Sequence, residues 1–114
     1  MPRVKQTRER IAKTEAIFRN VNEDINDASE RLDTDAAQFV CECGDPSCTD
    51  RIDIPLEEYE AVRKDPTRFV VSPGHVKGPI EKVVKRGRGY AVIEKRDHAI
   101  TRIVKRLNPR RGTT

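Results

Sequence analysis

Three cysteines lie close together in the sequence, and their spacing predicts a metal site. Cys41, Cys43 and Cys48 follow the pattern Cys-x-Cys-x4-Cys. Zinc binds four ligands in a tetrahedron, and thiolate and imidazole are its usual protein donors. Cys41 and Cys43 would share one face of a strand, because side chains alternate along a strand. The turn predicted from Gly44 to Ser47 would then bring Cys48 back to the same place.

The sequence offers two histidines as the fourth ligand. His75 ends the string Pro73-Gly74-His75 directly after a predicted strand, where a rigid turn would fix its imidazole ring. His98 lies instead in a charged stretch that is predicted to be helical. We therefore predict a structural Zn²⁺ site formed by Cys41, Cys43, Cys48 and His75.

Three other interpretations of the cysteine cluster stay open at this point. The thiols are free core residues in the first, since cysteine is a common small buried side chain. In the second they form a redox switch, although such switches typically use Cys-x-x-Cys beside a helix N-terminus. In the third they hold a catalytic metal, for which Glu42 is the only carboxylate flanked by cysteines.

Other catalytic patterns are missing from the sequence, and we predict a protein that is not an enzyme. The two histidines lie in dissimilar contexts, so no Ser-His-Asp set is recognisable. Gly87-x-Gly89 has no strand and helix around it to cradle a phosphate, and it indicates a turn. The His-x-Glu and Pro-Cys-x-x-Cys strings of zinc deaminases do not occur. No small-molecule substrate is inferred.

The elements that must position these ligands begin with one long helix over residues 1–36. No Gly or Pro occurs between Arg3 and Cys43 to interrupt it. Apolar and small residues recur along it in a heptad pattern, and we name these residues the heptad stripe: Val4, Thr7, Ile11, Thr14, Phe18, Val21, Ile25, Ala28 and Leu32. We expect the stripe to pack on the protein's own domain. A coiled-coil dimer or a protein partner docked along residues 4–32 is the alternative.

Residues 37–96 are predicted to form the metal-binding core, and residues 97–114 a basic helix and a loose tail. Alternating and β-rich stretches predict strands at residues 38–43, 51–54, 69–71, 80–85 and 90–95. Arg86 to Gly89 would be a hairpin turn, and Pro55 would begin a short helix over residues 56–64. The predicted fold class is α+β: a small zinc-stabilised antiparallel sheet with this short helix, the long amphipathic N-terminal helix and the basic C-terminal helix.

Charge is distributed unevenly along the chain, although the net charge is only +4. Residues 76–114 carry twelve basic and three acidic side chains, whereas residues 41–75 are net negative. Such a basic segment can neutralise phosphates without reading a base sequence. We predict contact with nucleic acid or a nucleoprotein complex through Lys82, Lys85, Arg86, Arg88, Lys95, Arg96, Arg102, Lys105, Arg106, Arg110 and Arg111. The alternatives are a basic face that meets no polyanion and a protein adaptor that uses only the N-terminal helix.

The length and composition of the chain indicate that a bound metal would add substantially to the stability of its fold. With 114 residues, 35% apolar and 37% charged, the chain has one domain's worth of sequence and a thin core. Such a core leaves roughly 3–5 kcal/mol of net stability, whereas structural zinc contributes roughly 10–16 kcal/mol of apparent binding energy. No apolar run is long enough to span a membrane or to form a signal peptide, so we expect a cytoplasmic protein.

Three strings in the core resemble a known family: Phe39-Val-Cys-Glu-Cys-Gly-Asp-x2-Cys48, Glu58-Tyr-Glu-x-Val-Arg63 and Arg68-Phe-Val-Val-x-Pro-Gly-His75. They are similar to strings in short uncharacterised bacterial zinc-binding proteins, where a helix like Glu15-Ala-Ile-Phe-Arg-x-Val-Asn-Glu23 often precedes them. The resemblance covers roughly residues 9–95 and leaves the basic C-terminal extension uncovered. It implies a zinc-site module, and its order of motifs supports pairing His75, not His98, with the cysteines.

Overall fold

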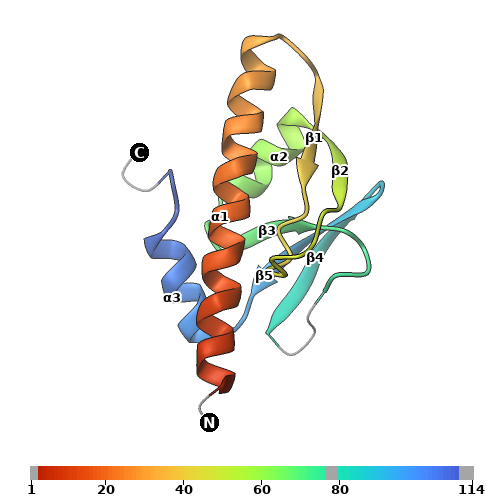
Figure 1. Cartoon of the computed structure of the whole chain (residues 1–114). Coiled ribbons are helices and arrows are strands. Elements are labelled where there is room, and N and C mark those ends of the chain that lie inside the picture. Colours follow the sequence, from red (N-terminus) through yellow and green to blue (C-terminus); the bar gives the residue numbers. More distant parts are fainter. Residues whose placement is uncertain (1–2, 77–79, 111–114) are drawn as a thin grey trace.

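The computed structural model of the chain describes residues 3–76 and 80–110 (Figure 1). Within these residues the protein has three helices and two small antiparallel sheets, which confirms the predicted α+β class. The elements follow one another along the chain as α1 (Arg3–Arg31), β1 (Ala36–Val40), β2 (Arg51–Pro55), α2 (Leu56–Arg63), β3 (Arg68–Val71), β4 (Glu81–Gly87), β5 (Tyr90–Lys95) and α3 (His98–Arg106).

The strands form two sheets rather than the single sheet that was expected. β1 and β2 pair with each other, with Phe39 opposite Ile52, and β2 alternates buried and exposed side chains as the sequence predicts. The second sheet has the order β3-β5-β4. In its hairpin Gly87 pairs with Tyr90, so Arg88 and Gly89 form a two-residue turn in which Gly89 has a φ of +80°.

Helix α1 packs against the rest of the protein through a polar face. Its fully buried side chains recur at helical spacing and are Ala12, Glu15, Ala16, Arg19, Asn22 and Asn26. The heptad stripe lies on a different side of the helix, and the expectation that it packs on the protein's own domain is wrong for two of its members. Val21 is 40% exposed and Leu32 is 76% exposed. Phe18 and Ile25 are half-buried.

The buried polar groups of α1 tie the helix to distant parts of the chain. Arg19 donates to the carbonyl oxygens of Pro66 and Val104, and its guanidinium lies 5.0 Å from the centre of the Phe69 ring. Glu15 forms a buried ion pair with Lys95, which also pairs with Glu81. Packing therefore crosses the predicted boundaries at residues 36 and 96. The boundary at residue 96 falls between β5 and α3, whereas the boundary at residue 36 falls inside β1.

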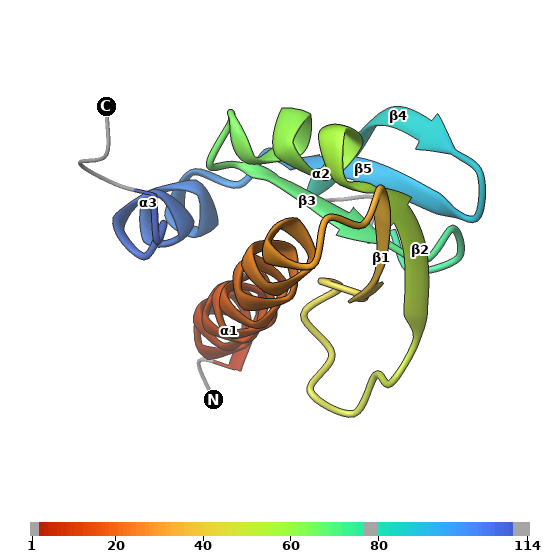
Figure 2. The same ribbon diagram turned by 90° about the horizontal axis from the view of Figure 1, so that it is seen from above.

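The shorter helices form where the sequence places their start signals. Pro55 precedes α2, whose buried side consists of Leu56, Tyr59, Val62 and Arg63. The Asp97 side chain caps α3 by accepting hydrogen bonds from the backbone N–H groups of Ala99 and Ile100. Viewed from above, α1 lies between α3 on one side and β1 with its following loop on the other (Figure 2). None of the helices described has the length and apolar character needed to cross a bilayer.

Candidate metal centre

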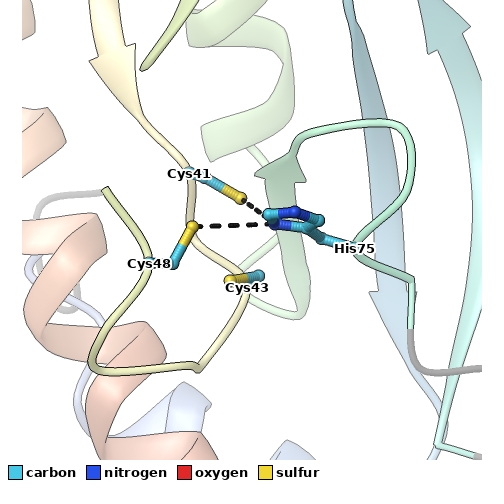
Figure 3. Close-up of side chains that lie close together, drawn as sticks. All are labelled: Cys41, Cys43, Cys48 and His75. Atoms are coloured by element: carbon cyan, nitrogen blue, oxygen red, sulfur yellow. Dashed lines mark hydrogen bonds between the residues drawn. The ribbon is translucent and has the colours of Figure 1, made fainter. Parts of the chain in front are cut away.

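The four predicted ligands come from two segments of the chain, one between β1 and β2 and the other directly after β3. Cys41 and Cys43 lie just after β1, Cys48 lies in the loop that leads into β2, and His75 lies in the turn after β3. Figure 3 shows the three thiols and the imidazole converging on one point. The cluster therefore links the two-stranded sheet to the three-stranded sheet.

The distances within the cluster match those of a tetrahedral metal site. All four ligand atoms lie within 4.8 Å of one another. His75 Nδ1 lies 3.5 Å from Cys41 Sγ and 3.6 Å from Cys48 Sγ. With Zn–S bonds of about 2.3 Å and Zn–N bonds of about 2.0–2.1 Å, sulfur and nitrogen ligands lie about 3.5–3.6 Å apart in a tetrahedron. The two distances from His75 Nδ1 therefore fit a tetrahedral zinc site, and the four side chains form a group that can hold a metal ion.

Two neighbouring groups orient the ligands. Nε2 of His75 lies 3.4 Å from Oδ2 of Asp50, on the opposite side of the ring from the thiols. A carboxylate at this place favours a proton on Nε2 and leaves Nδ1 free to bind a metal. The backbone N–H of Ser72 donates to Cys41 Sγ at 3.2 Å. Sequence reasoning missed Asp50, because neither its spacing nor its surroundings distinguish it from other surface carboxylates.

Burial of the cluster opposes ionisation of its thiols. Desolvation raises the pKa of Cys41 to about 12, although the N–H group of Ser72 counteracts part of this effect. Burial also raises the pKa of Cys43, and the backbone hydrogen bond from Asp45 counteracts it. Metal binding requires thiolates. A cation among the sulfur atoms would supply the missing stabilisation of their negative charge.

A tight turn against α1 brings Cys48 back to Cys43. Gly44 has a φ of +82°, and a Cβ atom at this position would lie 2.9 Å from Cγ2 of Ile11. Glycine is therefore required both by the left-handed backbone and by the close approach of the helix. The Asp45 side chain accepts from the N–H of Ser47, and its carbonyl accepts from the N–H of Cys48. This turn carries the predicted chemistry of Gly44 to Ser47.

Glu42 points away from the cluster and is not placed to act as a general base there. Its side chain is fully buried. One carboxylate oxygen accepts from the Asn22 amide, and the other accepts from Arg63 and from the backbone N–H of Val70. Asn22 also bonds both backbone polar groups of Val40. Glu42 is thus the centre of a buried network that joins α1, α2 and β3.

His98 is not part of the cluster, and the predicted basic residues do not form one surface. His98 is exposed at the start of α3. Figures 1 and 2 both place α3 and the tip of the β4–β5 hairpin at opposite ends of the molecule. The exposed basic side chains fall into a hairpin group, Lys82, Lys85, Arg86 and Arg88, and a helix group, Arg102, Lys105 and Arg106, with Arg96 between them.

Two of the other predicted basic residues form ion pairs with carboxylates of the protein itself. Lys95 is buried between Glu15 and Glu81. The prediction that Lys95 contacts nucleic acid is wrong, because an ammonium group held in the interior cannot reach a polyanion. Arg110 pairs with Glu23 and Glu60, which fixes the end of the described chain to α1 and α2. Arg111 lies outside the described residues.

Comparison with protein-family models, curated proteins and solved structures found no match for this chain. The geometry of the site is therefore the basis for a functional conclusion. Three cysteines and one histidine form a group that can hold a metal ion. Four ligands from the protein fill a tetrahedral coordination sphere.

Proposed function

We propose that the protein is a non-enzymatic zinc-binding interaction protein whose single Zn²⁺ stabilises the fold by joining its two sheets. The observation that carries this proposal is the convergence of Cys41, Cys43, Cys48 and His75, with all ligand atoms within 4.8 Å. Three sulfurs and one imidazole are a donor set typical of structural zinc. The soft thiolate ligands favour zinc over magnesium or calcium.

The surroundings of the site support a structural role over a catalytic one. Catalytic zinc keeps one coordination position for water or substrate, whereas four protein ligands leave none. The nearest candidate general base, Glu42, is committed to Asn22, Arg63 and the backbone of Val70. Asp50 is needed on the far side of His75, where it orients the imidazole ring.

The direct test is the zinc content of purified full-length protein, measured together with two matched histidine variants. We expect one zinc per chain, retained against a weak chelator. His75→Ala should lower zinc affinity strongly, because it removes one of four ligands, whereas His98→Ala should leave affinity unchanged. Cobalt-substituted protein should show the absorption of a tetrahedral site with thiolate ligands. Protein that folds without metal, or equal effects of the two variants, would contradict the proposal.

Nucleic acid is the proposed partner, and the hairpin group is the more suitable of the two basic groups. A two-stranded ribbon fits the major groove of a duplex. In this hairpin Arg86 lies exposed near the end of β4, and Arg88 lies exposed in the turn itself. Within the hairpin group the structure records one ion pair, 3.6 Å between Lys85 and Glu58.

Binding to duplex DNA and to structured RNA across a salt series tests this second part. We expect measurable affinity at about 50 mM salt that falls steeply as salt rises, because bound phosphates release counterions. Arg86→Ala with Arg88→Ala should reduce the salt slope by about 1 per lost contact. The matched pair Arg102→Ala with Lys105→Ala should change it less. Undetectable binding at low salt would leave the protein-adaptor alternative.

A further inference from the structure

The three cysteines of the metal centre differ in how far solvent reaches them. Cys41 and Cys43 are each 2% exposed, whereas Cys48 is only half-buried. Cys48 also lies in a loop, since its neighbours Ser47 and Thr49 are exposed and belong to no helix or strand. Oxidation of a thiolate requires that the oxidant reach its sulfur atom. Cys48 is therefore the member of the cluster that an oxidant from solvent meets first.

The thiol of Cys43 is placed to pair with that of Cys48 (Figure 3). All ligand atoms of the cluster lie within 4.8 Å of one another, and the Cys43 side chain interacts with that of Cys48. The turn from Gly44 to Ser47 already brings the two cysteines together, because the N–H of Cys48 donates to the carbonyl oxygen of Asp45. A disulfide needs its sulfur atoms about 2.0 Å apart, a shift that the exposed loop around Cys48 can supply.

Cys41 is held more firmly than the other two cysteines. Its sulfur accepts a hydrogen bond from the N–H of Ser72 at 3.2 Å, and its own N–H donates to the carbonyl oxygen of Asp50. The next N–H along the chain, that of Glu42, donates to the carbonyl oxygen of Val70. Pairing Cys41 with Cys48 would disturb these bonds. Cys43 is therefore the better partner.

The space around the cluster favours a small oxidant. A cavity of about 260 Å³ lies beside the cluster and is lined by Cys43, Asp45, Gly74, His75 and Val76. Hydrogen peroxide is little larger than a water molecule, whose share of liquid volume is about 30 Å³. A bulky disulfide such as oxidised glutathione must instead bring its own S–S bond into line with the attacking sulfur, which a half-buried thiol hinders.

We propose that Cys48 is a site of oxidation by small peroxides, and that the resulting Cys43–Cys48 disulfide releases the metal. The inference rests on the proposed zinc site, because zinc keeps its cysteine ligands as thiolates, the form that peroxide oxidises. After oxidation only Cys41 and His75 remain of the four ligands. Two ligands cannot complete a tetrahedral site, so the turn that carries His75 is no longer joined to the cysteine segment through an ion.

The chemistry takes two steps and consumes one molecule of hydrogen peroxide. The Cys48 thiolate first attacks a peroxide oxygen: an S–O bond forms, the O–O bond breaks, and hydroxide leaves a sulfenic acid behind. The Cys43 thiolate then attacks the sulfur of Cys48, so that the S–S bond forms, the S–O bond breaks and a second hydroxide leaves. Two thiolates lose two electrons in total, and the peroxide gains them. A dithiol reductant reverses the reaction by disulfide exchange.

Peroxide treatment of the zinc-loaded, full-length protein tests the proposal. A chromophoric chelator records zinc release, and mass spectrometry after alkylation maps the disulfides. We expect about one zinc ion released for each disulfide formed, a disulfide between Cys43 and Cys48, and a Cys41 that still takes the alkylating reagent once the protein is denatured. Dithiothreitol with added zinc should restore the metal content. Oxidised glutathione at the same concentration should release zinc more slowly.

Two matched variants that keep four ligands separate the roles of the two cysteines. In Cys43→His, peroxide should still oxidise Cys48, and dimedone should trap the sulfenic acid because the second thiol is missing. In Cys48→His, zinc should be retained under conditions that empty the wild-type protein. If either variant fails to load zinc, the disulfide map of the wild-type protein decides the assignment.

The outcomes distinguish failure of this proposal from failure of the zinc site itself. Protein that carries no zinc before peroxide is added contradicts the proposed function. Zinc-loaded protein that keeps its metal and its thiols in peroxide, or that forms a disulfide with Cys41, overturns the assignment of Cys48 and Cys43 and leaves the structural zinc in place. Equally fast release by oxidised glutathione overturns the preference for small peroxides.

Discussion

On one face of the short segment from Cys41 to Cys43, two thiols point towards Cys48 and His75, whereas on the other face the Glu42 carboxylate points into the interior. The thiol face brings together side chains from the segment between β1 and β2 and from the turn after β3, in a group that can hold a metal ion. The carboxylate face joins α1, α2 and β3 through Asn22, Arg63 and the backbone of Val70. Alternation of side chains along an extended segment makes this division possible.

The difference between the two faces shows how a chain with few large apolar residues holds its elements together. Both faces use polar groups where a larger domain would use apolar packing. The thiol face can take up an added ion, whereas the Glu42 face is complete within the chain itself. We therefore expect substitutions on the two faces to have different effects. Those on the thiol face should change zinc content, whereas those on the Glu42 face should change only the free energy of unfolding.

Loss of a ligand should have the largest effect. Cys43→Ser removes a thiolate, so zinc should be released and residues 38–95 should lose cooperative unfolding, while part of the α1 helical signal persists. Structural zinc contributes roughly 10–16 kcal/mol of apparent binding energy, which exceeds the net stability of a small domain. Thermal unfolding followed by circular dichroism, with zinc content measured in parallel, checks this. A variant that unfolds cooperatively at the wild-type temperature would contradict it.

Substitution on the opposite face should come next. Glu42→Ala leaves the buried Arg63 guanidinium without its carboxylate, a change that costs about 3–5 kcal/mol. Urea titration of the zinc-loaded protein measures the loss. Glu42→Gln is the matched control and should cost less, because the amide oxygen can still accept from the N–H of Val70. The zinc stoichiometry should stay at one per chain in both, and its loss would show that the two faces are not separable.

Substitution of Gly44, in the turn that follows Cys43, should lower the free energy of unfolding by an intermediate amount. Gly44→Ala places a Cβ atom at a φ of +82° and 2.9 Å from Ile11. Left-handed backbone costs a non-glycine residue about 1–2 kcal/mol, and displacement of Ile11 adds to this. The free energy of unfolding, again from urea titration, should fall by about 1–3 kcal/mol. Gly74→Ala is the control, since a Cβ atom there meets nothing within 4 Å.

The smallest effect is expected at the orienting carboxylate. Asp50→Asn keeps the shape of the side chain but removes the charge that lies beside Nε2 of His75. Zinc affinity should fall about tenfold, the lower end of the range for such groups, because Asp50 is half exposed. Competition with a chromophoric chelator measures the change. The unfolding temperature of zinc-saturated protein should be nearly unchanged, and an affinity equal to wild type would show that Asp50 does not orient the ring.

Local patterns in the sequence were enough for the secondary structure and for the ligand cluster. Alternation in Arg51–Pro55, the Pro55 start of α2 and the glycines of the β4–β5 turn each act within a few residues, and the structure places each element within a few residues of its predicted bounds. The cysteines and His75 were predictable because their chemistry is specific. The structure brings these four side chains together as predicted.

The inward face of α1 could not be predicted in this way. Apolar periodicity identifies the heptad stripe, but Glu15, Arg19 and Asn22 are buried because their partners lie far away in the chain. Arg19, for example, bonds the carbonyl oxygen of Val104, and Asn22 bonds Glu42. Nothing in the local sequence marks a charged side chain whose partner appears eighty-five residues later. The same reason hid Lys95, which reads as one more member of a basic segment until its two carboxylates are known.

The polar inner face of α1 also matters while the chain is being made. This helix leaves the ribosome well before Pro66 and Val104, the residues whose carbonyl oxygens receive the Arg19 guanidinium. Until then the face that will become interior exposes carboxylate, guanidinium and amide groups, which water solvates readily. An apolar face would stay exposed to water for the same time and would favour aggregation of the nascent chain. Segments that are synthesised after α1 then displace water from a face whose groups water had solvated.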